Sequence, residues 1–274
     1  MRDSYGIGFE FVKEMFILKN HKMEKYHGHF KDGLNPGDYS DDTQMSLAVA
    51  ELLVSGEEFN EFKLANKFVD AYNRDKIDGY AKGFQSLLDE CESGQDLLYK
   101  IKNTSNRNGA AMRAVPLGYI KDKEELLLKA EINAKITHNT KEGIFSSKAV
   151  ALMSNFFIYK KGKINQLKSY IEKELNVTID GNKESRCKCD ALETIDAVMT
   201  ALINNDNLFD IVYSSVQKGG DTDNVTPIAL GIAATSELYV KNLPSFMERD
   251  LRNNKYGKDY LIELDEKMSN FFNV

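Results

Sequence analysis

Apolar residues recur at helical spacing, or fill nearly every position, over seven segments of the chain. These are residues 44–54, 61–74, 123–136, 142–159, 164–175, 190–203 and 225–240. An α-helix completes a turn in about 3.6 residues, so this spacing predicts helices, and few segments show the alternation of a strand. The chain has only four prolines, which leaves long stretches without a helix breaker. The pattern predicts an all-α fold.

Two of these segments, 44–54 (QMSLAVAELLV) and 225–240 (VTPIALGIAATSELYV), are the most apolar. A helix that is apolar nearly all round is normally buried, so we expect both to be central. The polar stretch 176–189 (NVTIDGNKESRCKC) predicts a loop with a short extended piece rather than a linker between domains. Because internal repeats and low-complexity tracts are absent from the sequence, the simplest prediction is one compact multi-helix domain over residues 1–274.

The composition is that of an ordinary globular protein. With 274 residues and 42% hydrophobic content, the chain is long and apolar enough to bury a core. A formal net charge of -6 argues against a protein that holds nucleic acid mainly by neutralising phosphates. No apolar run approaches the ~20 residues of a membrane span, and the first residues lack the pattern of an export signal. Three cysteines, an odd number, argue against a disulfide scaffold and favour the cytoplasm.

Acidic motifs stand directly before the two most apolar segments: SDDTQM at 40–45 and GGDTDN at 219–224. One short polar residue there would cap a helix, and capping is an open interpretation for each motif taken alone. Capping does not need closely spaced carboxylates, however, and carboxylates that meet in a fold repel one another unless a counter-charge is present. Oxygen ligands without a neighbouring thiolate or imidazole suit Mg²⁺ or Mn²⁺ better than Zn²⁺. Capping with surface charge and a divalent-cation site are therefore the two interpretations.

Residues 105–119 (SNRNGAAMRAVPLGY) are rich in small side chains where a core helix would normally have bulk. Small residues let the backbone approach a partner closely, so the N–H groups of Asn108 and Gly109 could face a phosphate at a helix start. A tightly packed helix start is the alternative. Residues 136–140 (ITHNT) place His138 at a helix end, where a structural role and a role in a pocket are both open.

Five blocks in one order resemble the signature of the ADP-ribosylglycohydrolase family. They are DSYGIGFEF (3–11), SDDTQM (40–45), NGAAMR (108–113), THNT (137–140) and GGDTDN (219–224). The blocks together cover most of the chain, which makes them far more specific than any one motif. The resemblance implies an all-α domain with two Mg²⁺ or Mn²⁺ ions between the acidic motifs, and a hydrolase that cleaves the bond between ADP-ribose and its acceptor.

The same resemblance implies roles for individual residues. The metal ligands would be Ser40, Asp41, Asp42, Asp221, Asp223 and Asn224. Glu10 resembles the acidic residue beside the scissile bond, and Asp41 and Asp223 are further candidates for a catalytic role. The loop that holds the diphosphate would consist of Ser105, Asn106, Arg107, Asn108 and Gly109. His138 resembles a residue that lines the substrate pocket.

The chain departs from the family pattern at three places. Asn224 stands where the family usually has Thr or Ser, and its amide oxygen can still coordinate a hard cation, with a different reach. Arg107 replaces a small residue and could add a charge-assisted contact to a phosphate or point outward. Only Met1 and Arg2 precede Asp3, where family members commonly have an apolar helix, so we expect a less enclosed pocket near Glu10.

The implied reaction breaks a bond at the anomeric carbon of the distal ribose, so its transition state should have oxocarbenium character. We expect the ions to bind the vicinal ribose hydroxyls and to orient a water near that carbon. Glu10 or an aspartate of the metal site would assist proton transfer. An arginine on a protein is the acceptor favoured by the resemblance to bacterial members; serine, a nucleic-acid end and a small molecule are the alternatives.

Two other functions are compatible with acidic motifs in an all-α chain. A non-catalytic relative could bind ADP-ribose without cleaving it, and the substitution at Asn224 keeps that alternative open. A prenyl-transferring synthase would need carboxylates one helical turn apart, whereas the next acidic residue after Asp42 is Glu51. The sequence therefore disfavours the synthase.

Two further features carry weaker predictions. Cys187 and Cys189 form a C-x-C pair, but no second pair or adjacent histidine completes a zinc site, which favours structural or incidental thiols. His27 and His29, in KYHGHFKDG (25–33), could lie in a loop over the pocket or in an ordinary solvated loop.

Overall fold

The computed structural model describes residues 2–29 and 33–274 and is built from helices joined by loops. The α-helices are α1 (Arg2–Gly6), α2 (Glu14–Asn20), α3 (Asp41–Leu53), α4 (Glu61–Arg74), α5 (Lys82–Asp89), α6 (Gly94–Lys100), α7 (Gly109–Met112), α8 (Lys123–Lys135), α9 (Lys141–Ile158), α10 (Leu167–Leu175), α11 (Ala191–Ile203), α12 (Leu208–Lys218), α13 (Thr222–Ala234), α14 (Phe246–Arg249) and α15 (Lys258–Phe272). Three 3-10 helices accompany them: η1 (Ile7–Phe9), η2 (Val115–Tyr119) and η3 (Ile164–Gln166). Extended pairing within these two ranges is limited to isolated bridges, so the all-α prediction is confirmed.

Each of the seven predicted helical segments overlaps an observed helix, and 61–74 coincides with α4. The largest error concerns 225–240, because α13 begins inside the second acidic motif and ends at Ala234. The apolar pattern alone missed α12, α15 and shorter helices such as α2, α5 and α6. In α15 only Leu264 and Met268 are buried, so its apolar stripe is too thin to predict a helix.

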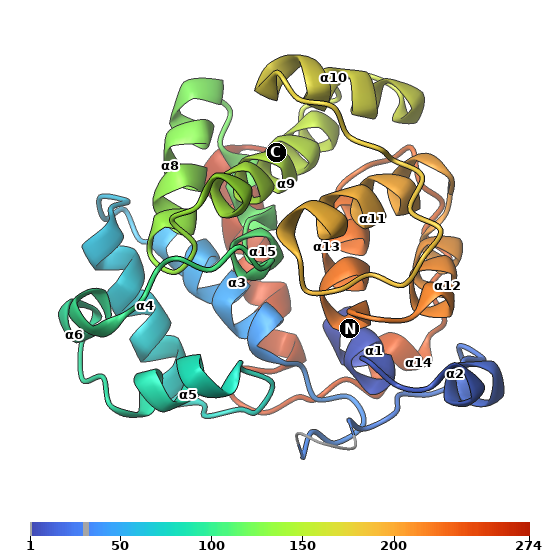
Figure 1. Cartoon of the computed structure of the whole chain (residues 1–274), viewed down its shortest axis with the longest axis horizontal. Coiled ribbons are helices and arrows are strands. Elements are labelled where there is room, and N and C mark those ends of the chain that lie inside the picture. Colours follow the sequence, from blue (N-terminus) through green and yellow to red (C-terminus); the bar gives the residue numbers. More distant parts are fainter. Residues whose placement is uncertain (1, 30–32) are drawn as a thin grey trace.

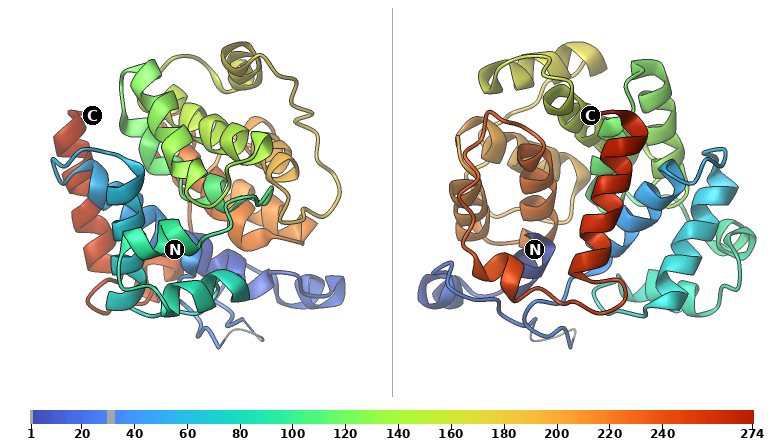
Figure 2. Two further views of the ribbon diagram at one scale, coloured as in Figure 1. Left: turned by 60° about the vertical axis from the view of Figure 1, so that its left-hand side comes forward. Right: turned by 180° about the vertical axis from the view of Figure 1, so that it is seen from behind.

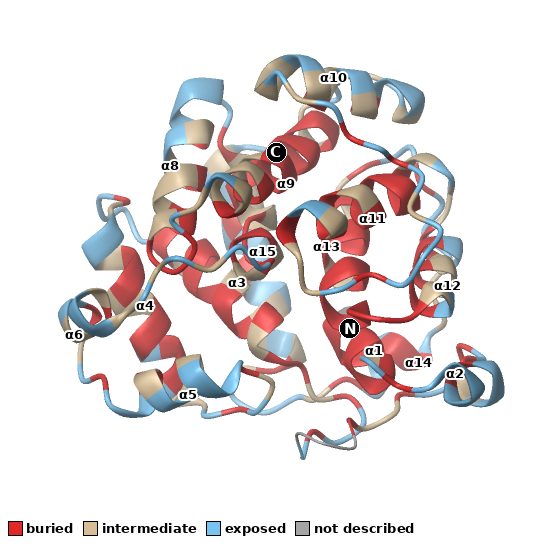
Figure 3. Ribbon diagram, in the orientation of Figure 1, coloured by how far each residue is buried: buried red, intermediate tan, exposed pale blue. Residues whose placement is uncertain are grey.

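The helix α13 lies in the middle of the molecule, with α1, α9, α11 and α12 packed around it (Figure 1). Eleven of its thirteen residues are buried, and nine of the thirteen residues of α3 are buried as well (Figure 3). This confirms the prediction that the two most apolar segments are central. One hydrophobic cluster extends along the sequence from Tyr5 to Met268.

The first block of the sequence packs tightly against the second acidic motif. A Cβ atom on Gly6 would lie 2.4 Å from the carbonyl oxygen of Thr222, and the Thr222 hydroxyl donates to the Gly6 carbonyl over 2.8 Å. A side chain at Gly6 would therefore push α1 away from α13. Glycine at this position lets the two backbones meet and brings the N-terminal block beside Asp221 and Asp223.

The stretch 176–189 contains no helix, as predicted, and runs along the outside of the molecule between α10 and α11 (Figure 2). Its short extended piece is the parallel bridge between Cys187 and Gly220, where the Asp221 N–H donates to the Cys187 carbonyl over 3.0 Å. Figure 2 also shows α15 on the opposite face, where it packs against α3 and η2. Among the described residues, no helix combines the length and apolarity needed to cross a membrane.

Packing between η2 and α9 yields a stability prediction. A Cβ atom on Gly118 would lie 2.3 Å from the Ser154 hydroxyl and 2.8 Å from the Asn155 backbone nitrogen, so Gly118→Ala forces η2 away from α9. We expect the free energy of unfolding in urea to fall by about 1–3 kcal/mol. The control is Gly83→Ala in α5, where a Cβ atom meets nothing within 4 Å and alanine should stabilise the protein by about 0.5–1 kcal/mol. Equal effects at both sites would contradict this packing.

Candidate active site

The acidic motifs lie at the N-termini of α3 and α13, and capping accounts for only one of their residues. Ser40 is the N-cap of α3, and its hydroxyl accepts a hydrogen bond from the Asp42 N–H. Asp221 occupies the N-cap position of α13 without making a side-chain capping bond. The carboxylates of these motifs therefore need an explanation other than capping.

The two motifs meet in space, and Glu10 joins them. Carboxylate oxygens of Glu10, Asp221 and Asp223 lie within 4.8 Å of one another, in an arrangement that could hold a metal ion. Asp42 lies close enough for the charges of Asp221 and Glu10 to act on it. Segments far apart in the sequence thus form one acidic cluster, which we define as Glu10, Asp41, Asp42, Asp221 and Asp223.

Burial makes ionisation of this cluster costly. Desolvation, followed by the charge of Asp3, raises the pKa of Asp41 to about 7. Desolvation raises the pKa of Asp42 and Asp223 well above the usual value, and neighbouring carboxylates raise it further. Full ionisation therefore requires a compensating positive charge close to the carboxylates.

Three buried oxygens in the two motifs are chemically suited to a hard cation. Asp42 Oδ2, Asp223 Oδ1 and Asn224 Oδ1 make no hydrogen bond within the described part of the chain. Buried polar atoms are normally paired, so three such oxygens from facing helix starts indicate ligand positions. The donor set consists of carboxylate and amide oxygens, as Mg²⁺ or Mn²⁺ prefers, and the residues present fit such ions.

The hydrogen bonds of Asn224 show which atoms of its side-chain amide face the acidic cluster. Its Nδ2 lies 3.1 Å from Asp221 Oδ1, and an ionised carboxylate only accepts hydrogen bonds. The amide nitrogen must therefore face Asp221, which leaves the amide oxygen as the atom without a partner. Asn224 therefore presents an amide oxygen that has no hydrogen-bond partner among the described residues, while its nitrogen holds Asp221.

Asn108 supports the acidic cluster rather than offering its side chain to a substrate. It is buried, and its Nδ2 donates to Asp221 Oδ2 over 2.6 Å and to the Thr194 hydroxyl over 3.0 Å. Its backbone N–H donates to the Cys189 carbonyl over 3.2 Å. This N–H is thus engaged within the protein, which fits the alternative of a tightly packed helix start at Asn108, and α7, a single turn, has only a weak dipole.

Gly109 is small because His138 packs against it. A Cβ atom on Gly109 would lie 2.7 Å from His138 Cε1, and the His138 Nδ1 is 2.6 Å from the Thr137 hydroxyl. Burial, together with the nearby positive charge of Arg113, lowers the pKa of His138 to about 3, so the imidazole is neutral. The SNRNG and THNT segments therefore lie side by side, as a shared pocket wall requires.

The preceding loop residues are accessible. Asn106 and Arg107 are exposed and Ser105 is half-buried. The Ser105 hydroxyl accepts from the Arg107 N–H over 3.2 Å, and the Ser105 carbonyl accepts from the Thr140 hydroxyl over 3.0 Å. These bonds shape an exposed turn next to His138, and diphosphate binding by the turn stays a prediction.

A histidine predicted for a loop over the pocket lies beside Glu10. His29 Nε2 is 3.6 Å from Glu10 Oε2, and the relative exposure of their side chains is 3% and 19%. Residues 30–32 of the same loop lie outside the described residues. His27 packs its ring edge-on against Phe9, 5.2 Å between centroids, so it is part of the packing around η1.

The C-x-C segment, Cys187 to Cys189, contacts the acidic cluster and Asn108 through its backbone carbonyls. Cys187 is buried and Cys189 half-buried, neither forms a disulfide, and burial raises the pKa of both thiols to about 12. The carbonyl of Cys187 holds Asp221 and that of Cys189 holds Asn108. These observations fit the structural interpretation of the two thiols.

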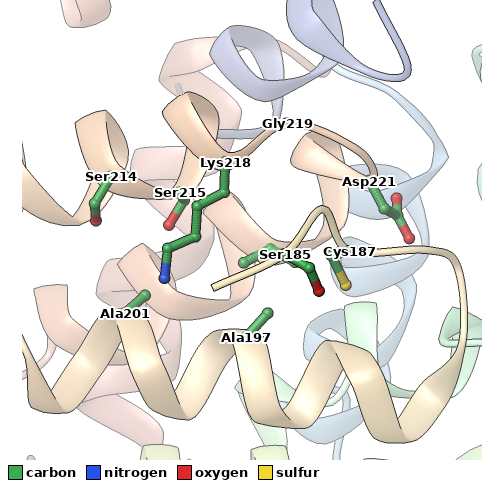
Figure 4. Close-up of a pocket in the computed structure, with 10 residues that line it drawn as sticks. Ser185, Cys187, Ala197, Ala201, Ser214, Ser215, Lys218, Gly219 and Asp221 are labelled. Atoms are coloured by element: carbon green, nitrogen blue, oxygen red, sulfur yellow. The ribbon is translucent and has the colours of Figure 1, made fainter. Parts of the chain in front are cut away.

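A small cavity lies behind Asp221, between α11, α12 and residues 185–187 (Figure 4). It offers ≈ 10 Å³ to the centre of a water molecule, enough for about one water. The hydroxyl of Ser215, which lines it, is buried without a hydrogen-bond partner among the described residues. The cavity is too small for a nucleotide, so it is not the site of an ADP-ribose group.

Sequence reasoning assigned no role to two buried charged residues, Asp3 and Arg113. Arg113 donates through Nε to Asn133 Oδ1 over 2.8 Å and through NH2 to the Thr137 hydroxyl over 2.7 Å. Burial lowers its pKa to about 9, and the charge of Asp41 partly offsets this. Arg113 is thus a buried cation next to the acidic cluster; the signal in the sequence was a lone charge within the apolar run AAMRAV.

Two curated proteins are similar to parts of this chain. The chain is 29% identical to chicken (Gallus gallus) "ADP-ribosylhydrolase ARH3" over 147 residues, which cover 49% of this chain and 40% of the relative. It is 21% identical to "ADP-ribosylarginine hydrolase Tri1" of Serratia proteamaculans, over 77% of this chain and 62% of the relative. The matches thus span less than two thirds of either relative.

A solved structure described as "ADP-ribosylglycohydrolase-related protein complex" has the same fold. Its TM-score is 0.78 with 18% sequence identity, and the alignment covers 98% of this chain and 93% of that one. The family model for ADP-ribosylglycohydrolase matches residues 3–267, which include both acidic motifs, Glu10 and His138. The chain therefore belongs to the ADP-ribosylglycohydrolase family.

Proposed function

We propose that this protein is a hydrolase that removes ADP-ribose from a modified acceptor and depends on two Mg²⁺ or Mn²⁺ ions. The observation that carries the proposal is the set of three buried, partnerless oxygens on Asp42, Asp223 and Asn224, which face one acidic cluster. Membership of the family supplies the class of substrate.

The cations would be held by Ser40, Asp41 and Asp42 from one motif and by Asp221, Asp223 and Asn224 from the other. When bound, they would bind ribose hydroxyls and lower the pKa of a coordinated water. Asn108 and Asn224 keep the Asp221 carboxylate in one orientation. Asp221 is therefore fixed on both oxygens before any ligand arrives.

Glu10 is the carboxylate best placed for proton transfer. Its side chain is 19% exposed, and of the other carboxylates of the acidic cluster only Asp41 is half-buried, whereas Asp42, Asp221 and Asp223 are buried. It can therefore touch the entering acceptor while its other contacts keep it near the acidic cluster. Proton transfer by a positioned carboxylate typically contributes ~10²–10⁴-fold to the rate. The neutral His138 and residues 105–107 would line the rest of the pocket.

We propose an arginine side chain on a protein as the acceptor. A guanidinium stays positively charged at all relevant pH values, so an acidic pocket attracts it both before and after cleavage. The bacterial relative named as an ADP-ribosylarginine hydrolase supports this choice. Serine, a nucleic-acid end and a small molecule are the alternative acceptors, and ADP-ribose binding without cleavage is the alternative activity.

The first test measures ADP-ribose release from peptides carrying ADP-ribosyl-arginine or ADP-ribosyl-serine. We expect release from the arginine peptide with Mg²⁺ or Mn²⁺, no release in EDTA, and at least ~100-fold loss in Asp41→Ala and Asp223→Ala. Unchanged turnover in these variants at saturating metal would rule out the two-metal site. Release from serine alone would correct the acceptor, and binding of ADP-ribose without release would identify a non-catalytic binder.

A second test uses the pH dependence of stability. The pKa of Asp41 in the folded protein, about 7, exceeds its usual value of 3.8, so the folded state binds this proton more tightly than the unfolded state. The stability contributed by that proton is complete below pH 3.8 and is lost as pH rises through about 7. In EDTA we therefore expect Tm to fall between pH 5 and pH 8, by about 2–4 °C for each kcal/mol lost.

Saturating Mn²⁺ should abolish this fall, because the cation neutralises the ionised carboxylates. The matched variant is Asp42→Asn, which removes one buried charge and keeps the shape of the side chain. Its Tm in EDTA should depend less on pH, and Mn²⁺ should raise it less. A Tm that is independent of pH in the metal-free wild type would contradict the burial of ionisable carboxylates in one cluster.

A further inference from the structure

Asp3 is a buried carboxylate that connects α1 to the start of α3. It is 1% exposed, and α1 holds it against the first acidic motif. Its Oδ1 accepts a hydrogen bond from the Ser40 hydroxyl over 2.8 Å. Its Oδ2 accepts from the Ser40 N–H over 2.7 Å, from the Thr43 hydroxyl over 2.8 Å and from the Thr43 N–H over 3.3 Å.

These bonds assign Asp3 a different task from that of the neighbouring aspartates. Both of its oxygens are engaged with Ser40 and Thr43, whereas Asp42 Oδ2 makes no hydrogen bond. Asp3 Oδ2 accepts three of these bonds, whereas each oxygen of Asp221 accepts one amide bond, so Asp3 is engaged with α3 rather than open to a cation. It acts on the residues that carry the ligand atoms.

A carboxylate at this position carries a cost that a neutral residue would avoid. Asp3 is buried against the start of α3, next to Asp41 and Asp42, and like charges brought together in a buried place repel one another. Capping the helix start needs only a neutral oxygen, because Ser, Thr and Asn serve that purpose well. The negative charge must therefore contribute something other than capping.

Asp3 contributes by fixing the direction in which the hydroxyl proton of Ser40 points. A hydroxyl can bind a cation only through a lone pair, so its proton must point elsewhere. The Ser40 hydroxyl donates to Asp3 Oδ1 over 2.8 Å, so its proton points toward α1. The lone pairs of the Ser40 hydroxyl are left for the Asp42 N–H, at 3.4 Å, and for the metal side.

We propose that Asp3 is a positioning residue for the metal site, which acts by holding the Ser40 hydroxyl proton away from the cation and the first turn of α3 in place. The inference rests on the proposed metal-dependent function. Outer partners of this kind typically change metal affinity by ~10–100-fold when they are replaced.

The test is Asp3→Asn, which keeps the size of the side chain and reverses one hydrogen bond. The amide oxygen can still accept from the Ser40 and Thr43 N–H groups, which places the NH2 group opposite the Ser40 hydroxyl. That hydroxyl must then accept, and its own proton turns toward the metal. In calorimetric titration of the metal-free full-length protein with Mn²⁺, we expect affinity to fall by ~10–100-fold.

Two further variants separate positioning from general damage. In a double-mutant cycle with Ser40→Ala, Asp3→Asn should cause little additional loss, because its effect passes through the missing hydroxyl. Thr43→Val removes a hydrogen bond of similar length to Asp3 without touching Ser40. It should lower the urea midpoint of the metal-free protein about as much as Asp3→Asn does, and leave Mn²⁺ affinity within about threefold of wild type.

Each outcome has a separate meaning. Unchanged Mn²⁺ affinity in Asp3→Asn, or losses that add fully in the double variant, would overturn the role of Asp3 while leaving the hydrolase untouched. Normal Mn²⁺ binding by the wild type without ADP-ribose release would reject the proposed activity and leave Asp3 testable by calorimetry. A wild-type protein that binds no Mn²⁺ would overturn both.

Discussion

Repulsion among buried carboxylates is the constraint on which the rest of this structure depends. Two like charges about 4 Å apart repel by about 4 kcal/mol at an effective dielectric constant of ~20, and Glu10, Asp221 and Asp223 approach within 4.8 Å. Such a cluster cannot stabilise itself. Apolar packing elsewhere must offset this repulsion, and the extensively buried helices α3 and α13, which carry the two motifs, provide that packing.

Apolar packing alone does not fix the orientation of a carboxylate, and hydrogen bonds from neighbouring residues do so here. Asn108 and Asn224 bind the two oxygens of Asp221, and the backbone of residues 187–189 fixes Asp221 and Asn108 in turn. Asp3 fixes the start of α3 in a similar way, because it accepts hydrogen bonds from the N–H and the hydroxyl of Ser40. The acidic cluster is therefore enclosed by groups that restrict orientation, while Asp42 Oδ2 and Asp223 Oδ1 have no hydrogen-bond partner among the described residues.

Much of the helical architecture could be predicted, because periodic apolar residues report burial directly. Helices with a thin buried stripe, such as α15, give no comparable signal. The two acidic motifs were recognisable by their excess of charge over what capping needs. The residues that hydrogen-bond around the acidic cluster were not recognisable from the sequence. Asn108 resembled a phosphate-binding residue, and Asp3 and Arg113 were given no role. Their contacts join segments that are distant in the sequence, so the local sequence does not reveal them.

The close approach of Gly6 to Thr222 has a consequence for biosynthesis. A ribosome delivers the first acidic motif and Asp3 long before it delivers Asp223, so a nascent chain carries its early carboxylates without the partners that α13 brings. During that interval α1 can contact the start of α3 through Asp3, but it lacks the surface of α13. The two acidic motifs can therefore meet only late in synthesis, when α13 has left the exit tunnel, and a chain that ends before Gly219 would carry only the first of them.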